Sequence, residues 1–266
     1  MALTNYFVFN IMLITRGDVM FDVEKTTNEI IEFIRNYYKE NKLKGVVIGI
    51  SGGKDSGVVA ALFAKALGPE NVIGVTMPCH SKESDRNDAK LVSDYYGFEL
   101  INIDLTDSFD SFKNQINILG DYDNDTLMNS DINIKPRLRM ATLYYVAALY
   151  SSIKAGTYIV AGTGNKCEEY VGYFTKGGDQ ISDIKVISDL TVSEVIKVGE
   201  YLNVPKQVLY KTPSDGLSGK SDEEKLGVKY KDIEDYIAGL LEDERVKQKI
   251  MNLHNGCLHK FHIPAY

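Results

Sequence analysis

The sequence predicts an α/β protein in which an open parallel sheet carries helices on both of its faces. Short runs of β-branched and aliphatic residues alternate along the chain with segments of helical periodicity. The run at residues 45–50 lacks the polar alternation of a strand with one wet face, so it suits a parallel strand covered on both sides. Strands that alternate with helices form right-handed crossovers, which place helices on both faces of such a sheet.

The individual elements follow in order from the spacing of the apolar residues. Residues 22–38 are expected to form an amphipathic helix with one buried face. The polar stretch 121–133 is expected to be a mobile loop, because it is rich in Asp and Asn. The expected strands are residues 45–50, 72–77, 99–103 and 158–161. The expected helices after the first are residues 58–67, 85–96, 107–119 and 137–150.

The helix expected at residues 137–150 is apolar around most of its circumference. Such a helix is buried on nearly every side, either in the core of the protein or at a subunit interface, and the sequence leaves both interpretations open. No repeat or linker divides the chain, so residues 22–266 are interpreted as one domain. Residues 1–21 are expected to be a loosely ordered extension, because their apolar stretch lacks the features of a signal peptide and is too short to span a bilayer.

The composition narrows the classes of function. Hydrophobic residues make up 44 % and charged residues 25 % of the 266 residues, as in an ordinary globular chain. The formal net charge of -7 argues against nucleic acid as the main partner, because that affinity comes largely from Lys and Arg. Cys79, Cys167 and Cys257 form no CxxC pair, so neither a zinc site nor a disulfide framework is indicated. A location in the reducing cytoplasm, without attachment to a membrane, is expected.

A glycine-rich loop, Gly49-Ile50-Ser51-Gly52-Gly53-Lys54-Asp55-Ser56-Gly57, follows the first strand and leads into a helix. Paired glycines let the backbone turn sharply and bring several N–H groups together, and the helix N-terminus adds partial positive charge. The loop matches neither the Walker A pattern nor the dinucleotide fingerprint. It resembles the Ser-Gly-Gly-x-Asp-Ser signature of the ATP pyrophosphatases, which cleave ATP between its α and β phosphates. That resemblance implies that the loop holds pyrophosphate and that Asp55 presents a carboxylate to Mg²⁺.

A second group of polar residues follows the strand at residues 158–161. Gly162 to Glu168 and Gly172 to Asp183, together with 221–227, resemble the ammonia-dependent NAD synthetases, and the likeness runs from about Asp22 to Pro264. This family belongs to the adenine nucleotide alpha hydrolase-like proteins, which have a Rossmann-like three-layer fold. The resemblance implies that the carboxylate of deamido-NAD attacks the α-phosphorus of ATP and that ammonia then displaces AMP to give NAD.

The same resemblance assigns roles to individual residues. Asp55 and Glu168 are expected to hold Mg²⁺, and Asp179 to accept a proton from ammonia. ATP is expected to contact Gly49, Ile50, Ser51, Gly52, Gly53, Lys54, Asp55, Ser56, Thr163 and Ser214. Deamido-NAD is expected to contact Arg137, Lys176, Asp183, His259 and Lys260. The family also implies a homodimer. The chain has no room for a glutaminase domain beside this one, so free ammonia, or ammonia delivered by a separate protein, is the expected nitrogen source.

Each of these residues also has an ordinary structural interpretation. Lys176, Asp183 and His259 taken singly would be solvated surface groups, and Thr163 would cap a strand end. Lys54 occupies the variable position of the signature and could face solvent. Cys167 is interpreted as a small buried side chain rather than a nucleophile, because no base is evident beside it.

The chain departs from the family pattern at two places. Val192 stands where the family usually has a lysine that contacts ATP phosphate, so either another cation, such as Lys54, Lys185 or Lys197, supplies that charge or the charge is missing. Pro136, before Arg137, stands where the family usually has alanine, and proline is well tolerated in the first turn of a helix.

Two other classes of function share the phosphate loop. A tRNA thiolase or an amidotransferase fragment like GMP synthetase is disfavoured, because a thiolase needs reactive cysteines and a basic surface for RNA. A sensor that binds nucleotide without turnover is disfavoured as well, since it does not need two separate carboxylates for a metal ion at the phosphate that reacts.

Overall fold

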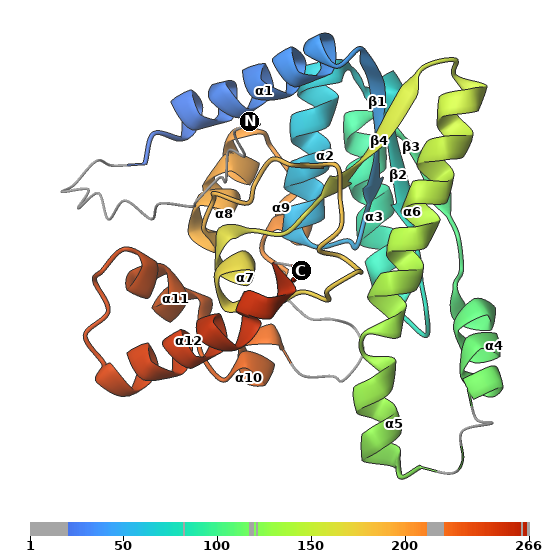
Figure 1. Cartoon of the computed structure of the whole chain (residues 1–266). Coiled ribbons are helices and arrows are strands. Elements are labelled where there is room, and N and C mark those ends of the chain that lie inside the picture. Colours follow the sequence, from blue (N-terminus) through green and yellow to red (C-terminus); the bar gives the residue numbers. More distant parts are fainter. Residues whose placement is uncertain are drawn as a thin grey trace, which may run out of the picture.

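The fold is an open parallel sheet between two layers of helices, which confirms the predicted fold class (Figure 1). The computed structural model describes residues 21–81, 83–116, 120, 122–211, 221–261 and 263–264. Within this part of the chain the strands are β1 (Leu43–Gly49), β2 (Val72–Thr76), β3 (Glu99–Asn102), β4 (Thr157–Gly162) and β5 (Ile184–Lys185), in the order β3-β2-β1-β4-β5. The four strands predicted from the sequence are all present, within two residues at each end.

The helices surround this sheet and continue beyond it. Their bounds are α1 (Val23–Glu40), α2 (Lys54–Leu67), α3 (Glu83–Tyr96), α4 (Thr106–Ile116), α5 (Asn124–Asp131), α6 (Ile134–Ile153), α7 (Lys166–Val171), α8 (Val192–Tyr201), α9 (Lys206–Leu209), α10 (Asp222–Leu226), α11 (Tyr230–Ile237) and α12 (Glu244–Cys257). Short 3₁₀ turns are η1 (Pro69–Asn71) and η3 (Leu258–Lys260). No helix in the described part of the chain has both the length and the apolar character needed to cross a bilayer.

Alternate residues of β1 supply two separate cores, one on each face of the sheet. Val46 and Ile48 pack with α1, α2, α3 and α8, whereas Val47 packs with α4 and α6. All three valine and isoleucine side chains are fully buried. This arrangement explains why the strand has no polar alternation, because both of its faces are covered by helices (Figure 1).

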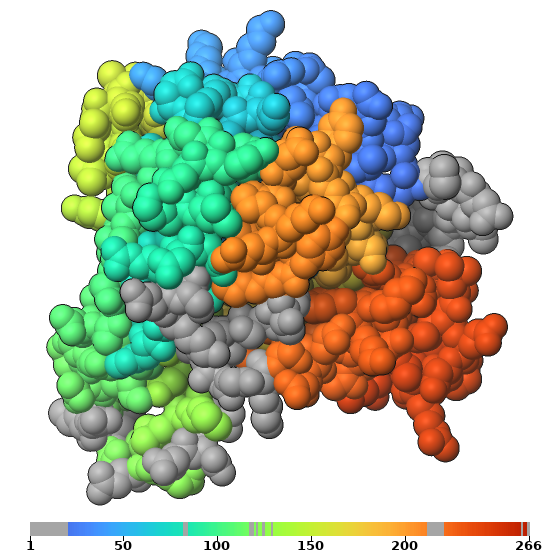
Figure 2. Space-filling model, turned by 180° about the vertical axis from the view of Figure 1, so that it is seen from behind, coloured from blue at the N-terminus to red at the C-terminus, as the bar shows by residue number. Residues whose placement is uncertain are grey.

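A third, smaller core joins the C-terminal helices to α7. Cys167, Val171, Leu226, Ile233 and Ile250 are its main buried members. In Figure 1 the helices α10, α11 and α12 lie together, in red, to one side of the sheet. Figure 2 shows from behind that they form one continuous region of the surface beside the orange segment that contains α9. This third core therefore attaches the C-terminal part of the chain to the end of the sheet where β4 leads into α7.

The order of the strands places a binding crevice between β1 and β4. The chain runs from β1 outward through β2 to β3, and then returns to the other side of β1 to form β4. Open α/β sheets bind ligands beyond the carboxyl ends of their strands at such a switch point. The glycine-rich loop follows β1 and the second polar group follows β4, so the two motifs are neighbours in space.

Two predictions about individual elements were wrong or incomplete. The stretch 121–133 is not a simple loop, because the Asp123 side chain accepts a hydrogen bond from the Thr126 amide (2.8 Å) and begins α5. Helix α2 begins at Lys54, four residues before the predicted start, and the Gly57 amide donates to the Gly53 carbonyl (3.1 Å) in its first turn. Residues 1–20 and 117–119 lie outside the described residues, so neither the N-terminal extension nor the end of the helix predicted at 107–119 can be compared.

Helix α6 is buried on one side only. Val146, Ala147 and Tyr150 face the core, while Tyr145, Leu149 and Ile153 are 73 %, 46 % and 62 % exposed in the single chain. The interpretation of this segment as a helix buried throughout the core is therefore wrong for the isolated chain. Pro136 lies in the first turn of α6, as predicted.

Candidate active site

A cavity of about 730 Å³ lies at the carboxyl ends of the strands. Its volume is typical of pockets that bind ligands the size of a nucleotide. Its walls are formed by the glycine-rich loop, the turn after β4, the segment between α7 and β5, and the N-terminal half of α6. Lys260, near the C-terminus, also lines it.

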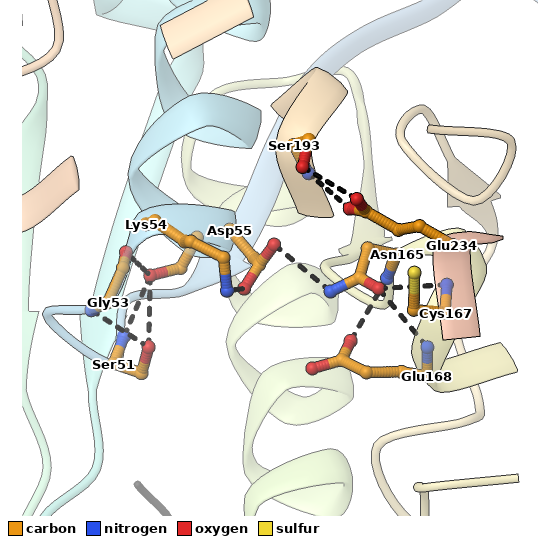
Figure 3. Close-up of polar contacts among 10 residues, drawn as sticks. Ser51, Gly53, Lys54, Asp55, Asn165, Cys167, Glu168, Ser193 and Glu234 are labelled. Atoms are coloured by element: carbon orange, nitrogen blue, oxygen red, sulfur yellow. Dashed lines mark hydrogen bonds and ion pairs between the residues drawn. The ribbon is translucent and has the colours of Figure 1, made fainter. Parts of the chain in front are cut away.

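The glycine-rich loop is held in shape by its two serines (Figure 3). Ser56 Oγ accepts a hydrogen bond from the Ser51 amide (3.2 Å) and donates to the Gly53 carbonyl (3.1 Å). Ser51 Oγ accepts from the Gly53 amide (3.2 Å). Gly52 has a φ of +76°, in the left-handed region that favours glycine. No side chain caps α2, so the amides of its first turn remain directed toward the cavity end of the helix, where they can bind an anion.

Asn165 brings the two predicted metal ligands together. Its side-chain amide donates to Asp55 Oδ1 (3.2 Å), and its backbone amide donates to Glu168 Oε2 (3.0 Å). Its Oδ1 accepts from the amides of Cys167 and Glu168, which completes a capping box at the start of α7. In Figure 3 Asp55 lies to the left of Asn165 and Glu168 lies below it. The fully buried Asn165 therefore fixes the position of both carboxylates, a role that the sequence analysis did not assign to it.

The electrostatics of the carboxylate pair favour a bound cation. Burial, and next the neighbouring Asp55 carboxylate, raise the pKa of Glu168 to about 8, although Lys54 opposes the shift. Two carboxylate oxygen sites suit Mg²⁺, a hard cation that commonly takes its remaining ligands from phosphate and water. The described residues contain no group of three or more His, Cys, Asp or Glu side chains that could hold a metal. The residues present thus fit Mg²⁺ that takes its other ligands from a nucleotide and water.

The interpretation of Lys54 as a solvent-facing residue was wrong. Its side chain is only 4 % exposed, and its Nζ lies 2.8 Å from Asp55 Oδ2. Lys54 lines the cavity, whereas Lys185 forms an ion pair with Glu169 and Lys197 lies on α8 beside the ring of Phe21. Of the three lysines considered as replacements for a cation at Val192, Lys54 is therefore the one beside the phosphate loop. Val192 itself packs against the third core.

Three of the five residues predicted to bind deamido-NAD form a chain of contacts, and Lys260 is the only one of the five among the described residues that line the cavity. The Arg137 guanidinium donates to the Lys176 carbonyl (3.2 Å), and Lys176 Nζ donates to the His259 carbonyl (2.7 Å). Lys260 Nζ donates to the carbonyls of Gly172 (2.7 Å) and Phe174 (2.9 Å). These contacts bring α6, the segment after α7 and the C-terminal turn η3 together, although the residues are far apart in the sequence.

The other predicted site residues are more scattered. Thr163 and Asp179 line the cavity. Asp179 Oδ1 accepts from the Thr175 amide (2.8 Å); protein crowding around its carboxyl group raises its pKa, although the side chain is exposed to the cavity. Asp183 does not line the cavity, and its oxygens accept from the Val160 amide (2.8 Å) and the Tyr144 hydroxyl (3.1 Å). Ser214 lies outside the described residues.

The sequence analysis missed an ion-pair network behind the loop. Lys211 Nζ lies 2.8 Å from Asp85 Oδ1 and 2.6 Å from Asp88 Oδ2, and Lys211 and Asp85 both line the cavity. Asp222, within the third family block, also lines the cavity and accepts from the Tyr173 hydroxyl (2.9 Å). No local pattern marks Lys211, because its partners lie more than 120 residues away. Cys167 is a buried side chain as predicted, and burial raises the pKa of its thiol to about 12, which makes it a poor nucleophile.

A parallel sheet with an anion-binding loop at the switch point and a facing pair of carboxylates defines an α/β protein that binds phosphorylated ligands. The family model described as NAD synthase matches residues 26–260, and the chain belongs to that family. The NH(3)-dependent NAD(+) synthetase of Carboxydothermus hydrogenoformans is 38 % identical over 215 residues, which cover 80 % of this chain and 85 % of that protein.

Two solved structures are similar over nearly the whole chain. One is described as the NMN synthetase from Francisella tularensis, with a TM-score of 0.84, 31 % identity, and coverage of 93 % of this chain and 99 % of that one. The other is an NH3-dependent NAD synthetase from Campylobacter jejuni, with a TM-score of 0.74, 28 % identity and the same coverage.

Proposed function

We propose that this protein is a ligase that amidates deamido-NAD with ammonia at the expense of ATP, releasing AMP and pyrophosphate. Family membership gives the reaction class. The observation that carries the proposal is that Asn165 holds both Asp55 and Glu168, beside a phosphate loop and inside one cavity. That arrangement suits a triphosphate whose β and γ phosphates become the leaving group.

The proposed reaction has two displacement steps. The carboxylate oxygen of the nicotinate ring attacks the α-phosphorus of ATP, a P–O bond forms, and the bond to pyrophosphate breaks. Ammonia then attacks the carbonyl carbon of this acyl adenylate, loses a proton, and expels AMP. A free carboxylate resists ammonia because its leaving group would be oxide, whereas AMP is a stable leaving group. Mg²⁺ held by Asp55 and Glu168 would neutralise charge on the phosphates.

The chain's own residues would position the reactants for these steps. The loop from Gly49 to Ser56 would hold pyrophosphate, and Thr163 and Ser214 would contact ATP. Arg137, Lys176, Asp183, His259 and Lys260 would hold deamido-NAD. Asp179 would accept the proton that ammonia loses. Its raised pKa supports that role, because a more basic carboxylate is a better proton acceptor.

A labelling experiment tests the reaction most directly. Purified protein is incubated with ATP, Mg²⁺, ammonium and deamido-NAD whose carboxylate carries ¹⁸O. We expect NAD, AMP and pyrophosphate in equal amounts, with one ¹⁸O atom transferred to AMP by the displacement at the α-phosphorus. ADP and orthophosphate as products, or unlabelled AMP, would rule the mechanism out.

A second substrate is favoured by one comparison. The Francisella tularensis structure, with the higher TM-score of the two, is described as an NMN synthetase. The same chemistry on nicotinate mononucleotide would give nicotinamide mononucleotide. Measuring kcat/KM for the mononucleotide and for deamido-NAD in the same assay decides between them, and we expect the dinucleotide to be preferred.

We also propose that the chain forms a homodimer through α6. Tyr145, Leu149 and Ile153 recur at helical spacing and are exposed, and Phe112 and Ile116 of the neighbouring α4 are exposed as well. An apolar surface of this kind supports an interface between two copies. Cys79, Cys167 and Cys257 are free thiols, which supports a reducing, cytoplasmic location.

The dimer can be tested by placing a charge on this face. Tyr145→Glu is expected to weaken dimerisation by about 100-fold or more, because an aromatic side chain at an interface centre is replaced by a carboxylate that loses its water. Sedimentation at micromolar concentration measures the change. The control is Leu240→Glu, another exposed apolar residue, at 70 % exposure, away from α6. A wild-type monomer, or an unchanged Tyr145→Glu dimer, contradicts the prediction.

A further inference from the structure

Lys54 is buried, although the burial of a charged lysine side chain is energetically unfavourable. It is the first residue of α2, and lysine side chains are almost never fully buried unless they are paired. Its ammonium forms an ion pair with Asp55 and lies 5.7 Å from the centre of the Tyr230 ring. The contact of 2.8 Å with Asp55 Oδ2 pairs the ammonium with a carboxylate, so Lys54 brings a positive charge to the cavity that it lines.

The stability of α2 does not explain this charge. The N-terminus of a helix carries partial positive charge, so a cation in the first turn is electrostatically unfavourable there. The same end of the helix faces the phosphate loop, and Lys54 lines the cavity together with Ser51, Gly53 and Ser56. A lysine that opposes the helix dipole at an anion-binding loop is accounted for if an anion of high charge binds beside it.

A metal ion can bind Asp55 and Glu168 while Lys54 keeps its contact with Asp55. Lys54 Nζ contacts Asp55 Oδ2, whereas the Asn165 side chain contacts Oδ1. Glu168 Oε2 accepts from the Asn165 amide, and no hydrogen bond to Glu168 Oε1 is found among the described residues. A metal ion can therefore bind Glu168 Oε1 and a remaining lone pair of Asp55 while the ammonium stays on Oδ2. Lys54 and the metal do not compete for the same oxygen atom.

We propose that Lys54 is a permanent second cation of the triphosphate site, which remains on Asp55 when Mg²⁺ binds and supplies its charge to the departing pyrophosphate. This inference rests on the proposed function and extends it. Lys54 adds its charge to those of the divalent ion and the loop amides. With it, the protein provides a fixed positive charge that needs no second metal ion.

Lys54→Met is the test, because methionine has a similar length and no charge. We expect pyrophosphate, titrated by calorimetry at saturating Mg²⁺, to bind about 10- to 100-fold more weakly. Mg²⁺ alone, followed by thermal shift, should bind as well as or better than in the wild type, since a neighbouring positive charge has been removed. Lys65→Met is the matched control, an exposed lysine in the last turn of the same helix, and should leave both affinities unchanged.

The two affinities separate the possible roles of Lys54. If Lys54→Met binds both pyrophosphate and Mg²⁺ more tightly, the ammonium competes with the metal. If both affinities stay unchanged or both fall, the role of Lys54 is structural. Each of these results overturns the proposal. Lys54→Arg keeps the charge and should retain pyrophosphate binding within several-fold, so a loss equal to that of Lys54→Met also overturns it. If one of these results is obtained and the wild-type protein still converts deamido-NAD to NAD, the proposal for Lys54 fails while the proposed function stands.

A measurement on the wild-type protein covers the case in which Lys54→Met does not fold. Acetic anhydride modifies accessible amines, and peptide mass spectrometry reports the modification of each lysine. Lys54 should be protected in the free protein and equally protected with Mg²⁺, and pyrophosphate should not expose it. Increased labelling of Lys54 when Mg²⁺ is added means that the ammonium leaves Asp55, which overturns the proposal.

Discussion

Replacement of Glu168 by glutamine is expected to stabilise the metal-free protein at alkaline pH while it stops the reaction. The pKa of Glu168 is raised to about 8 in the folded protein, above its value of 4.5 as a free side chain. The folded state therefore binds a proton more tightly than the unfolded state. Stability with respect to this group is greatest below pH 4.5, falls as the pH rises from there through about 8, and levels off above that value.

Glutamine has the shape of the protonated carboxyl group and no charge to lose. Its amide oxygen can still accept from the Asn165 amide, so the capping box of α7 should survive. Because one pKa unit corresponds to about 1.4 kcal/mol, we expect a gain on the order of 1–3 kcal/mol at pH 9 and little gain at pH 5. NAD formation should fall by about 10³-fold, since one of the two carboxylates proposed to hold Mg²⁺ is missing.

Urea denaturation at pH 5 and pH 9 without metal measures the first effect, and the rate of AMP release measures the second. Glu194→Gln is a matched control, because Glu194 accepts from the Thr191 amide (2.9 Å) in the capping box of α8 and does not line the cavity. It should change neither quantity. A Glu168→Gln protein that is less stable at pH 9, or that keeps a tenth of the wild-type rate, contradicts this account.

The sequence was sufficient for features that depend on neighbouring residues. The strands were predictable because a strand buried on both faces has an uninterrupted apolar run in the sequence. The phosphate loop was predictable because its glycines and the start of the following helix are adjacent in the sequence. Helices α7, α9 and α10 have six, four and five residues, too few to show a helical period, and were missed. Helices α8, α11 and α12, with 10, 8 and 14 residues, were not assigned either. Asp123 capping turned a polar stretch into α5, which composition alone does not reveal.

Features of the site that depend on distant contacts were not predictable. Asn165 meets Asp55 across 110 residues of sequence, so its role as a bridge between the two carboxylates needed the fold. The burial of Lys54 likewise results from packing against Tyr230 and Asp55 at the N-terminus of α2, whereas its place in the signature made it look variable. Family resemblance indicated which residues to consider, but not that Asp183 would lie beside β4, outside the cavity lining.

Gly52→Ala is expected to cost the phosphate site both its shape and its stability. Gly52 has a φ of +76°, and an added Cβ atom would overlap the backbone oxygen of Asp85 and lie 3.1 Å from Asp88 Cβ. The left-handed backbone alone costs an alanine about 1 kcal/mol. The overlap adds to this, because backbone atoms of α3 cannot rotate away as a side chain can. We expect a loss of about 2–4 kcal/mol in unfolding free energy and about 100-fold weaker pyrophosphate binding.

Gly239→Ala separates backbone strain from the overlap, since Gly239 has a nearly equal φ of +74° and a Cβ there would meet no atom within 4 Å. It should lose only about 1 kcal/mol and bind pyrophosphate normally. The difference between the two variants then measures how firmly α3 is held behind the loop. Lys211 ties Asp85 and Asp88 to the segment after α9, so α3 should resist displacement. If Gly52→Ala matched Gly239→Ala in stability and in pyrophosphate affinity, α3 would have moved aside, and the loop would not depend on this contact for its shape.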